Sequence, residues 1–161
     1  MDRCIIIPLK KLEESKSRLS KYLTVEERIT LTKAMLRDVL NACLASSFPK
    51  IFIVSQGFRD LLENDKVEFV INEKELNSAL RETIEIVKRD YFSFLILPAD
   101  IPLIEKDDLE HMSILMENFD ILLSPSFDSG TNALFMKKDK MIDLEYGEGK
   151  KSFLLHLNNA L

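Results

Sequence analysis

Glycine and cysteine are both scarce in this chain, and each shortage narrows the class of protein. Only four of the 161 residues are glycine, so each glycine is informative about the backbone around it. The two cysteines, Cys4 and Cys43, have neither the spacing of a metal site nor the density of a disulfide-stabilised secreted domain. We therefore expect two buried thiols in a protein of the reducing cytoplasm.

Long apolar runs and a surplus of positive charge are also missing. No apolar run reaches the ~18 residues of a membrane-spanning helix, and the short run at residues 4–9 lacks the length and cleavage site of a signal peptide. The formal net charge of -5 argues against a surface that binds nucleic acid by neutralising phosphates. These absences predict a soluble cytoplasmic protein with no membrane and no nucleic acid as partner.

The composition that remains is that of an ordinary globular protein, 46% hydrophobic and 30% charged. The chain has no internal repeat, no low-complexity run and no Pro/Ser-rich linker. A chain of this length buries roughly 70% of the surface that its unfolded form exposes. We therefore expect a single domain over residues 1–161.

Short apolar runs alternate with segments of helical periodicity, which predicts an α/β fold with a central, mostly parallel sheet. The expected strands are residues 4–8, 50–55, 67–71, 92–97, 120–124 and 131–136, with the strand at 120–124 buried. The expected helices are residues 25–46 with Thr24 as N-cap, 58–64, a segment within 72–88, 105–118 and 153–160. His111 is expected on the surface of its helix.

The most informative segment is residues 92–102, where a buried strand runs directly into Pro98-Ala99-Asp100-Ile101-Pro102. Ligands of open α/β sheets bind outside the carboxyl ends of the strands, so Asp100 is expected to project into the binding crevice. The flanking prolines restrict the loop, and a carboxylate held there suits a divalent cation that bridges nucleotide phosphates. An ordinary turn or helix-capping aspartate would give the same pattern, and both interpretations stay open.

Positive charge is concentrated in residues 9–23, between the first strand and the first helix. This segment is longer than the usual connection between a strand and a helix, and such loops are usually functional. A triphosphate is the expected partner, and Lys16 and Arg18, which the apolar Leu19 follows, are less well explained as a solvated basic face. A solvated lysine face is the better interpretation for Lys11 and Lys21.

Three later segments place polar groups where a ligand could reach them. Asn77, in the first turn of a helix, could read a base edge or simply cap the helix. Gly130, just ahead of Thr131, could let a phosphate or carboxylate approach the backbone, or could supply the positive φ of a tight hairpin. Ser152, which follows a glycine cluster, could hold an anion at a helix start.

Taken in order, these segments resemble the 2-phospho-L-lactate guanylyltransferase family of coenzyme F420 biosynthesis over nearly the whole chain. Each segment alone would be weak, whereas their order makes the resemblance specific. The segments are Ile7-Pro8-Leu9-Lys10 with Lys16-Ser17-Arg18-Leu19, Glu26-Glu27-Arg28 with Met35-Leu36-Arg37-Asp38-Val39-Leu40, Leu76-Asn77-Ser78-Ala79-Leu80, Leu97-Pro98-Ala99-Asp100-Ile101-Pro102-Leu103, Gly130-Thr131-Asn132-Ala133-Leu134, and Tyr146-Gly147 through Ser152-Phe153 with His156.

The resemblance implies a three-layer, Rossmann-like nucleotidyltransferase fold. It implies transfer of GMP from GTP to 2-phospho-L-lactate, phosphoenolpyruvate or 3-phosphoglycerate, with release of pyrophosphate and with Mg²⁺ as cofactor. A molybdopterin or sugar phosphate fits less well as acceptor, because the first loop lacks the Gly-x-Gly-Thr-Arg pattern of the enzymes that use those acceptors.

The resemblance also implies site residues. The implied catalytic residues are Lys16, Arg18 and Asp100, with Asp100 as the metal ligand. The implied nucleotide-binding residues are Leu9, Lys10, Ser17, Ala99 and, for the guanine, Asn77. The implied acceptor-binding residues are Thr131, Asn132, Gly147, Gly149 and Ser152.

Members of the family usually continue past the His156 region, through a further strand, to an acidic segment beside the metal. Residues 1–161 contain no such segment. The resemblance therefore leaves an alternative, a catalytically weak or inactive relative that binds guanine nucleotides. A homodimer that closes the sheet is a second implication of the missing strand.

Overall fold

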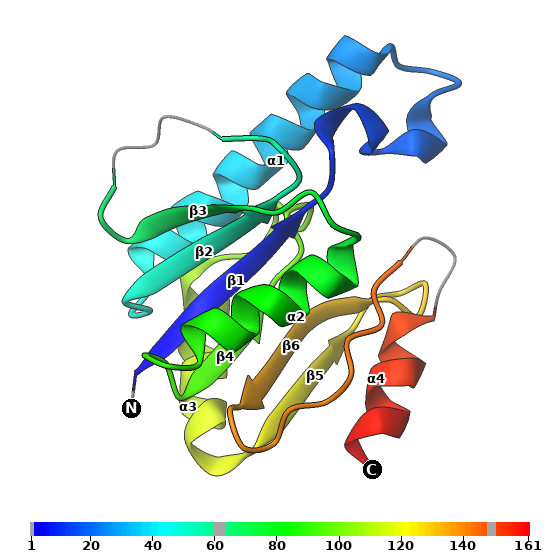
Figure 1. Cartoon of the computed structure of the whole chain (residues 1–161). Helices are drawn as coiled ribbons and strands as arrows, with labels where there is room; N and C mark the ends of the chain where they lie inside the picture. Colours follow the sequence, from blue (N-terminus) through cyan, green and yellow to red (C-terminus); the bar gives the residue numbers. More distant parts are fainter. Residues whose placement is uncertain (1, 60–63, 148–150) are drawn as a thin grey trace.

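A computed structural model describes residues 2–59, 64–147 and 151–161, and it contains one sheet with helices on both faces (Figure 1). The strands are β1 (Arg3–Leu9), β2 (Lys50–Ser55), β3 (Val67–Ile71), β4 (Ser93–Ile96), β5 (Ile121–Pro125) and β6 (Thr131–Lys137). The helices are α1 (Val25–Ala45), α2 (Leu76–Val87), α3 (Lys106–Asn118) and α4 (Ser152–Ala160), with the 3-10 turns η1 (Leu12–Glu14) and η2 (Ser17–Leu19) between β1 and α1. The predicted α/β class is confirmed.

The sheet has the strand order β3-β2-β1-β4-β6-β5. The first four strands of that order are parallel, whereas β6 runs antiparallel to both β4 and β5. Because β6 runs backwards, its first residue Thr131 pairs with Pro125, the last residue of β5. Thr131 therefore lies at the same edge of the sheet as the carboxyl ends of β1 and β4, which is the edge where α/β sheets bind ligands.

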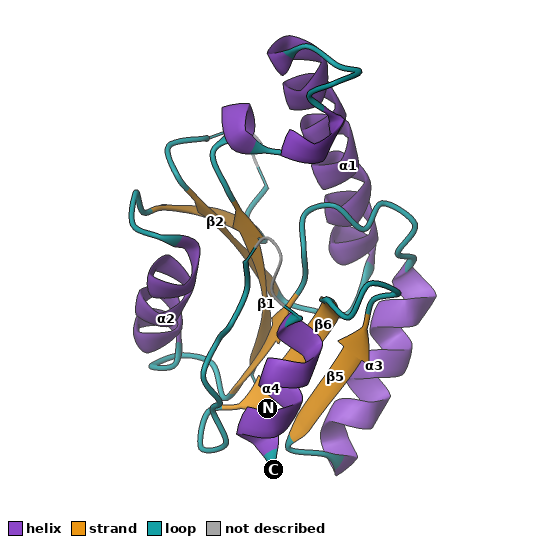
Figure 2. Ribbon diagram, turned by 90° about the vertical axis from the view of Figure 1, so that its right-hand side faces the viewer, coloured by secondary structure: helices purple, strands orange, loops and turns teal. Residues whose placement is uncertain are grey.

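Strand β1 contributes to both hydrophobic cores because successive side chains point to opposite faces. Ile5 and Ile7 belong to the core that α1 and α3 cover, whereas Cys4 and Ile6 belong to the core that α2 covers. Figure 2 shows α2 on one side of the sheet and α1 with α3 on the other. Helix α4 lies on the α2 side, beside β5 and β6.

Helix α1 begins as its sequence predicts. The Thr24 hydroxyl accepts a hydrogen bond from the Glu27 amide at 3.2 Å, and the Glu27 carboxylate accepts one from the Thr24 amide at 2.8 Å. This reciprocal pair is a capping box, which satisfies two backbone donors at the helix start. The Thr24 amide, followed by the Thr24 hydroxyl, which donates to the same carboxylate at 2.9 Å, lowers the pKa of the Glu27 carboxyl. The N-cap prediction for Thr24 is confirmed.

Two further expectations have clear outcomes, and a third is largely untested. Cys4 and Cys43 are buried free thiols, as expected, and desolvation raises the pKa of both to about 12. The expected burial of residues 120–124 is wrong, because β5 is an edge strand that pairs only with β6 and its residues are half-buried. The helix expected at residues 58–64 falls largely on residues outside the described ranges.

No helix in residues 2–59, 64–147 or 151–161 combines the length and the apolar character that a membrane span requires.

Candidate functional site

The first loop folds over the ligand-binding edge of the sheet, so that Lys16 contacts Asp100. The ammonium of Lys16 donates to a carboxylate oxygen of Asp100 at 2.7 Å, and the two side chains are 23% and 49% exposed. Lys16 precedes η2 with φ 54° and ψ 37°, a left-handed conformation that non-glycine residues seldom adopt. Backbone strain of this kind is concentrated at functional sites. A cation and a carboxylate that lie 84 positions apart in sequence are thus adjacent and accessible.

Arg18, from the same loop, points toward the segment that precedes β6. Its guanidinium lies 3.9 Å from a carboxylate oxygen of Asp128, and both side chains are about two-thirds exposed, at 71% and 68%. Solvent therefore screens the pair strongly. The hydroxyl of Ser126, followed by the amide of Gly130, lowers the pKa of the Asp128 carboxyl by hydrogen bonding. Asp128 consequently stays ionised and holds the loop in shape.

Gly130 does not have the positive φ considered from sequence, whereas the approach of a ligand to its backbone stays a prediction. The positive φ of this turn belongs to Ser129, at 68°, and not to Gly130. A Cβ atom on Gly130 would lie 2.6 Å from the Ser126 hydroxyl oxygen and 3.3 Å from an Asp128 carboxylate oxygen. The position therefore requires glycine because the side chains of its own loop approach the backbone closely.

Asn77 is buried, at 6% exposed, and both the nitrogen and the oxygen of its side-chain amide are hydrogen-bonded. Its amide nitrogen donates to the Tyr146 carbonyl at 2.8 Å, and its amide oxygen accepts from the Tyr146 backbone N–H at 2.9 Å. The N-cap of α2 is Glu75, whose carboxylate accepts from the amides of Asn77 and Ser78. Asn77 is thus not the capping residue, and its side chain ties α2 to the segment before α4. A contact with guanine stays a prediction that requires release of this pair.

Thr131, Ser152 and His156 form a buried hydroxyl–imidazole cluster between β6 and α4. The Thr131 hydroxyl lies 3.1 Å from the Ser152 hydroxyl and 2.9 Å from Nδ1 of His156. The other ring nitrogen, Nε2, accepts a hydrogen bond from the Glu145 backbone N–H at 2.9 Å. Burial lowers the pKa of His156, and the nearby Glu145 carboxylate opposes this shift only in part. The imidazole is therefore held neutral.

The remaining predicted residues differ in how far their side chains can reach a ligand. Leu9 and Ala99 are buried in the core on the α1 side, so only their backbone groups are available to a nucleotide. Lys10, Ser17 and Gly147 are exposed. Asn132 is half-buried and donates weakly to the Pro125 carbonyl at 3.4 Å. Gly149 lies outside the described residues.

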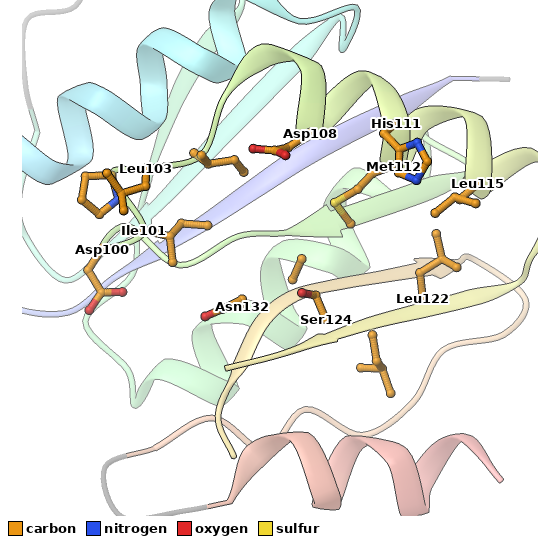
Figure 3. A pocket seen from close by; sticks show the side chains of 14 residues that line it. Asp100, Ile101, Leu103, Asp108, His111, Met112, Leu115, Leu122, Ser124 and Asn132 are labelled. Carbon is orange, nitrogen blue, oxygen red and sulfur yellow. The ribbon is translucent and has the colours of Figure 1, made fainter. Parts of the chain in front are cut away.

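A groove of about 770 Å³ leads away from Asp100 between α3 and the strands β5 and β6 (Figure 3). Asp100, Asn132 and Ser124 contribute polar side chains to it. Its remaining lining is mostly apolar and includes Ile101, Leu103, Met112, Leu115, Leu122 and Leu123. His111 also lines the groove and is exposed on α3, as the sequence predicts. A small polar ligand at Asp100 would therefore occupy one end of a longer apolar channel.

The residues around Asp100 suit a cation only when a second ligand supplies oxygen atoms. Within the described ranges, no three His, Cys, Asp or Glu side chains form a cluster that could hold a metal ion. Mg²⁺ is commonly held by one or two carboxylates together with substrate phosphates and water. Asp100 meets that requirement for a ternary complex, in which Lys16 must share or release its carboxylate.

The fold defines the class of protein. The structure matches a nucleotide-diphospho-sugar transferase from Desulfovibrio desulfuricans with a TM-score of 0.78 and 16% identity, covering 99% of this chain and 77% of that chain. It also matches Rv0371c from Mycobacterium tuberculosis, solved as a complex with manganese, with a TM-score of 0.59 and 12% identity over 86% of this chain and 72% of that chain. The Rossmann-like nucleotidyltransferase fold is therefore confirmed.

The sequence defines the family. A family described as guanylyl transferase CofC like matches residues 3–161. The 2-phospho-L-lactate guanylyltransferase of Methanocaldococcus vulcanius is 37% identical over 161 residues, covering 97% of this chain and 70% of the relative. This chain belongs to the CofC-like guanylyltransferase family, and the resemblance stated from its motifs is confirmed.

Sequence reasoning assigned no role to His156, Glu145 or Tyr146, which contact the predicted site residues, although Tyr146 and His156 belong to the motifs of the resemblance. Ser152 and His156 are four positions apart in one helix, a spacing that places them on the same face, and this signal could have linked them. Glu145 and Tyr146 act through backbone groups, for which residue type gives no signal.

Proposed function

We propose that this chain transfers GMP from GTP to 2-phospho-L-lactate and releases pyrophosphate. The observation that carries the proposal is the family match over residues 3–161, together with relatives named 2-phospho-L-lactate guanylyltransferase that align with 97% of the chain. None of these matches favours the alternative of an inactive nucleotide-binding relative. Phosphoenolpyruvate and 3-phosphoglycerate carry the same phosphate and carboxylate groups and are the competing acceptors.

The transfer forms a bond between an acceptor phosphate oxygen and the α-phosphorus of GTP. It breaks the bond from that phosphorus to the oxygen that bridges to the β-phosphate, so pyrophosphate leaves with this oxygen. The acceptor phosphate is already anionic at neutral pH, and no general base is needed. Catalysis then depends on alignment of the acceptor and on neutralisation of the triphosphate.

In this proposal, different residues at the carboxyl ends of the parallel strands bind the triphosphate, the cation and the acceptor. Lys16 and Arg18 neutralise the triphosphate, and Lys10, Ser17 and the backbone at Leu9 and Ala99 hold the nucleotide. Asp100 holds a divalent cation, Mg²⁺ in this proposal, and this cation would neutralise phosphate oxygens. Thr131, Ser152, Asn132 and the glycines at 147 and 149 receive the phosphate and carboxylate of the acceptor. Guanine recognition by Asn77 requires its release from Tyr146.

The proposal is tested by measuring pyrophosphate release from GTP and Mg²⁺ with each of the three phospho-acids in parallel. Asp100→Asn removes the charge of the proposed metal ligand, and we expect the turnover rate to fall by about 100-fold or more. Asp139→Asn is the matched control, because Asp139 is an exposed aspartate beyond the far end of β6. Equal rates in wild type and Asp100→Asn would contradict the assignment of Asp100.

A further inference from the structure

One backbone group, the N–H of Glu145, determines which atoms donate and which accept in the hydroxyl–imidazole cluster. A backbone N–H can only donate, so Nε2 of His156 must accept the hydrogen bond from Glu145 at 2.9 Å. A neutral imidazole whose Nε2 accepts carries its proton on Nδ1. Nδ1 therefore donates to the Thr131 hydroxyl oxygen, 2.9 Å away.

This direction leaves one hydroxyl hydrogen without an acceptor in the cluster. Thr131 and Ser152 have one hydroxyl hydrogen each, and the 3.1 Å bond between them uses one of the two, whichever residue donates. Within the described part of the chain, neither hydroxyl has another acceptor. A donor in such a buried place is costly unless a ligand or water accepts its hydrogen.

The opposite tautomer would remove this donor. If Nε2 carried the proton, Nδ1 would accept the hydrogen of Thr131, and Thr131 would accept the hydrogen of Ser152. Both hydroxyl hydrogens would then be used inside the cluster. The number of hydrogen-bond donors that the pair can offer to a ligand thus depends on the state of His156, which is itself 0% exposed.

We propose that His156 is a positioning residue, which makes the Thr131–Ser152 pair a one-hydrogen donor aimed at an anionic group of the acceptor. This inference rests on the proposed function, since the acceptor is a small phospho-acid there. The two hydroxyl residues retain 6% and 5% exposure, whereas the imidazole is sealed beneath them by the edge-to-face ring of Tyr146 at 4.8 Å. The hydroxyl pair is the less deeply buried part of the cluster, and His156 contacts it from the interior.

Steady-state kinetics of three variants separate positioning from a merely structural role. His156→Phe removes both hydrogen bonds of the imidazole, so the hydroxyl pair keeps its spare hydrogen but loses the group that fixes its direction. We expect the KM for 2-phospho-L-lactate to rise about tenfold through misalignment of this donor, while the KM for GTP stays within twofold. His156→Asn retains an N–H donor near the position of Nδ1 and should recover much of this loss. His111→Gln, which changes the other histidine, is the control.

A second measurement does not depend on turnover. The chain has only two histidines, so ¹⁵N NMR of imidazole-labelled protein, with His111→Gln for assignment, reports His156 directly. We expect a neutral ring with the proton on Nδ1 at pH 7, and a shift of that signal when 2-phospho-L-lactate is added with GTP. A ring protonated on Nε2, or on both nitrogens, would overturn the inference even if His156→Phe fails to fold.

The outcomes also distinguish this inference from the proposed function. If the wild type binds no 2-phospho-L-lactate in the presence of GTP, the proposed function fails and the inference fails with it. If the wild type binds 2-phospho-L-lactate and folded His156→Phe has an unchanged KM for it, only the inference fails. An equal rise of both KM values in His156→Phe would assign a structural role and would also overturn the inference.

Discussion

The ammonium of Lys16 lies 2.7 Å from a carboxylate oxygen of Asp100, so the group proposed to bind the triphosphate is paired with the group proposed to bind the cation. In the proposed complex, GTP and a divalent cation would give each of them a new partner of opposite charge. The ion pair holds the two side chains together beyond the end of β4, and the proposal requires the substrate complex to replace this contact.

Replacement of Lys16 by Met should change the two binding steps in opposite directions. The Lys16 ammonium competes with a cation for the Asp100 carboxylate, and Lys16→Met removes this competition. Mn²⁺ should therefore bind the nucleotide-free protein about two- to fivefold more tightly, the range expected for an exposed ion pair. Affinity for GTP should fall in the same variant. Calorimetric titration with Mn²⁺ alone and with GTP measures both effects.

Lys21→Met is the control for this experiment, since Lys21 is an exposed lysine of the same loop. It should leave both affinities unchanged. A Lys16→Met variant that binds Mn²⁺ more weakly than the wild type would contradict the competition between Lys16 and the cation.

Asn77→Ala should destabilise the protein because it leaves two backbone groups of Tyr146 without partners. We expect the free energy of unfolding to fall by about 1–3 kcal/mol, the usual cost of buried groups left unpaired. Urea unfolding measures this loss, and Asn158→Ala, at an exposed position of α4, is the control. Unchanged stability with reduced preference for GTP over ATP would instead support guanine recognition.

Gly130→Ala should strain the loop before β6, since its Cβ would lie 2.6 Å from the Ser126 hydroxyl oxygen. That hydroxyl must then move and release its hydrogen bond to Asp128. We expect the melting temperature to fall by about 2–4 °C, which corresponds to a loss of about 1 kcal/mol in a chain of this size.

Ser126→Ala removes the clashing oxygen, and the next atom of Ser126 is 3.8 Å away. In the Ser126→Ala background, Gly130→Ala should therefore cost less than in the wild type. An identical cost in both backgrounds would place the strain elsewhere.

His156 should make stability depend on pH in the weakly acidic range. Burial lowers the pKa of His156 in the folded protein. Below pH 6.5, about the pKa of a histidine in the unfolded chain, the unfolded chain therefore binds a proton more readily than the folded protein does. This contribution to stability is present above that pH and is lost as the pH falls through it.

The free energy of unfolding of the wild type should therefore decrease more between pH 7.5 and 5.5 than that of His156→Phe. Urea titrations at both pH values measure the difference, with His111→Gln as control. Parallel pH dependence in wild type and His156→Phe would contradict a neutral, buried imidazole.

Much of the fold could be predicted because its signals are local. The apolar runs that form β2 and β3 have the predicted bounds, and the capping box of α1 follows from Thr24 and Glu27 alone. The burial of β5 was predicted wrongly, since an edge position depends on the order of the strands and not on the residues of the strand.

The contacts of the site depend on tertiary packing and could not be predicted in the same way. Asn77 and Tyr146 are 69 positions apart, and Thr131 and His156 are 25 apart. The sequence placed Lys16 and Asp100 after the carboxyl ends of two strands, Thr131 at the start of a strand and Ser152 at the start of a helix, but it did not place all four at one edge of the sheet. The sequence does not indicate that the backbone amide of Glu145 donates to Nε2 of His156, because every residue except proline has such an amide.

The most direct test of the proposed function follows the α-phosphate of GTP. Wild-type protein is incubated with GTP labelled at the α-phosphate, Mg²⁺ and 2-phospho-L-lactate, and the products are separated. The proposal predicts that the label moves into a new compound that forms only when a phospho-acid is present, in equal amount with pyrophosphate, and that Asp100→Asn abolishes it. Protein that binds GTP but transfers no label to 2-phospho-L-lactate, phosphoenolpyruvate or 3-phosphoglycerate, even at high protein concentration, would contradict the proposal.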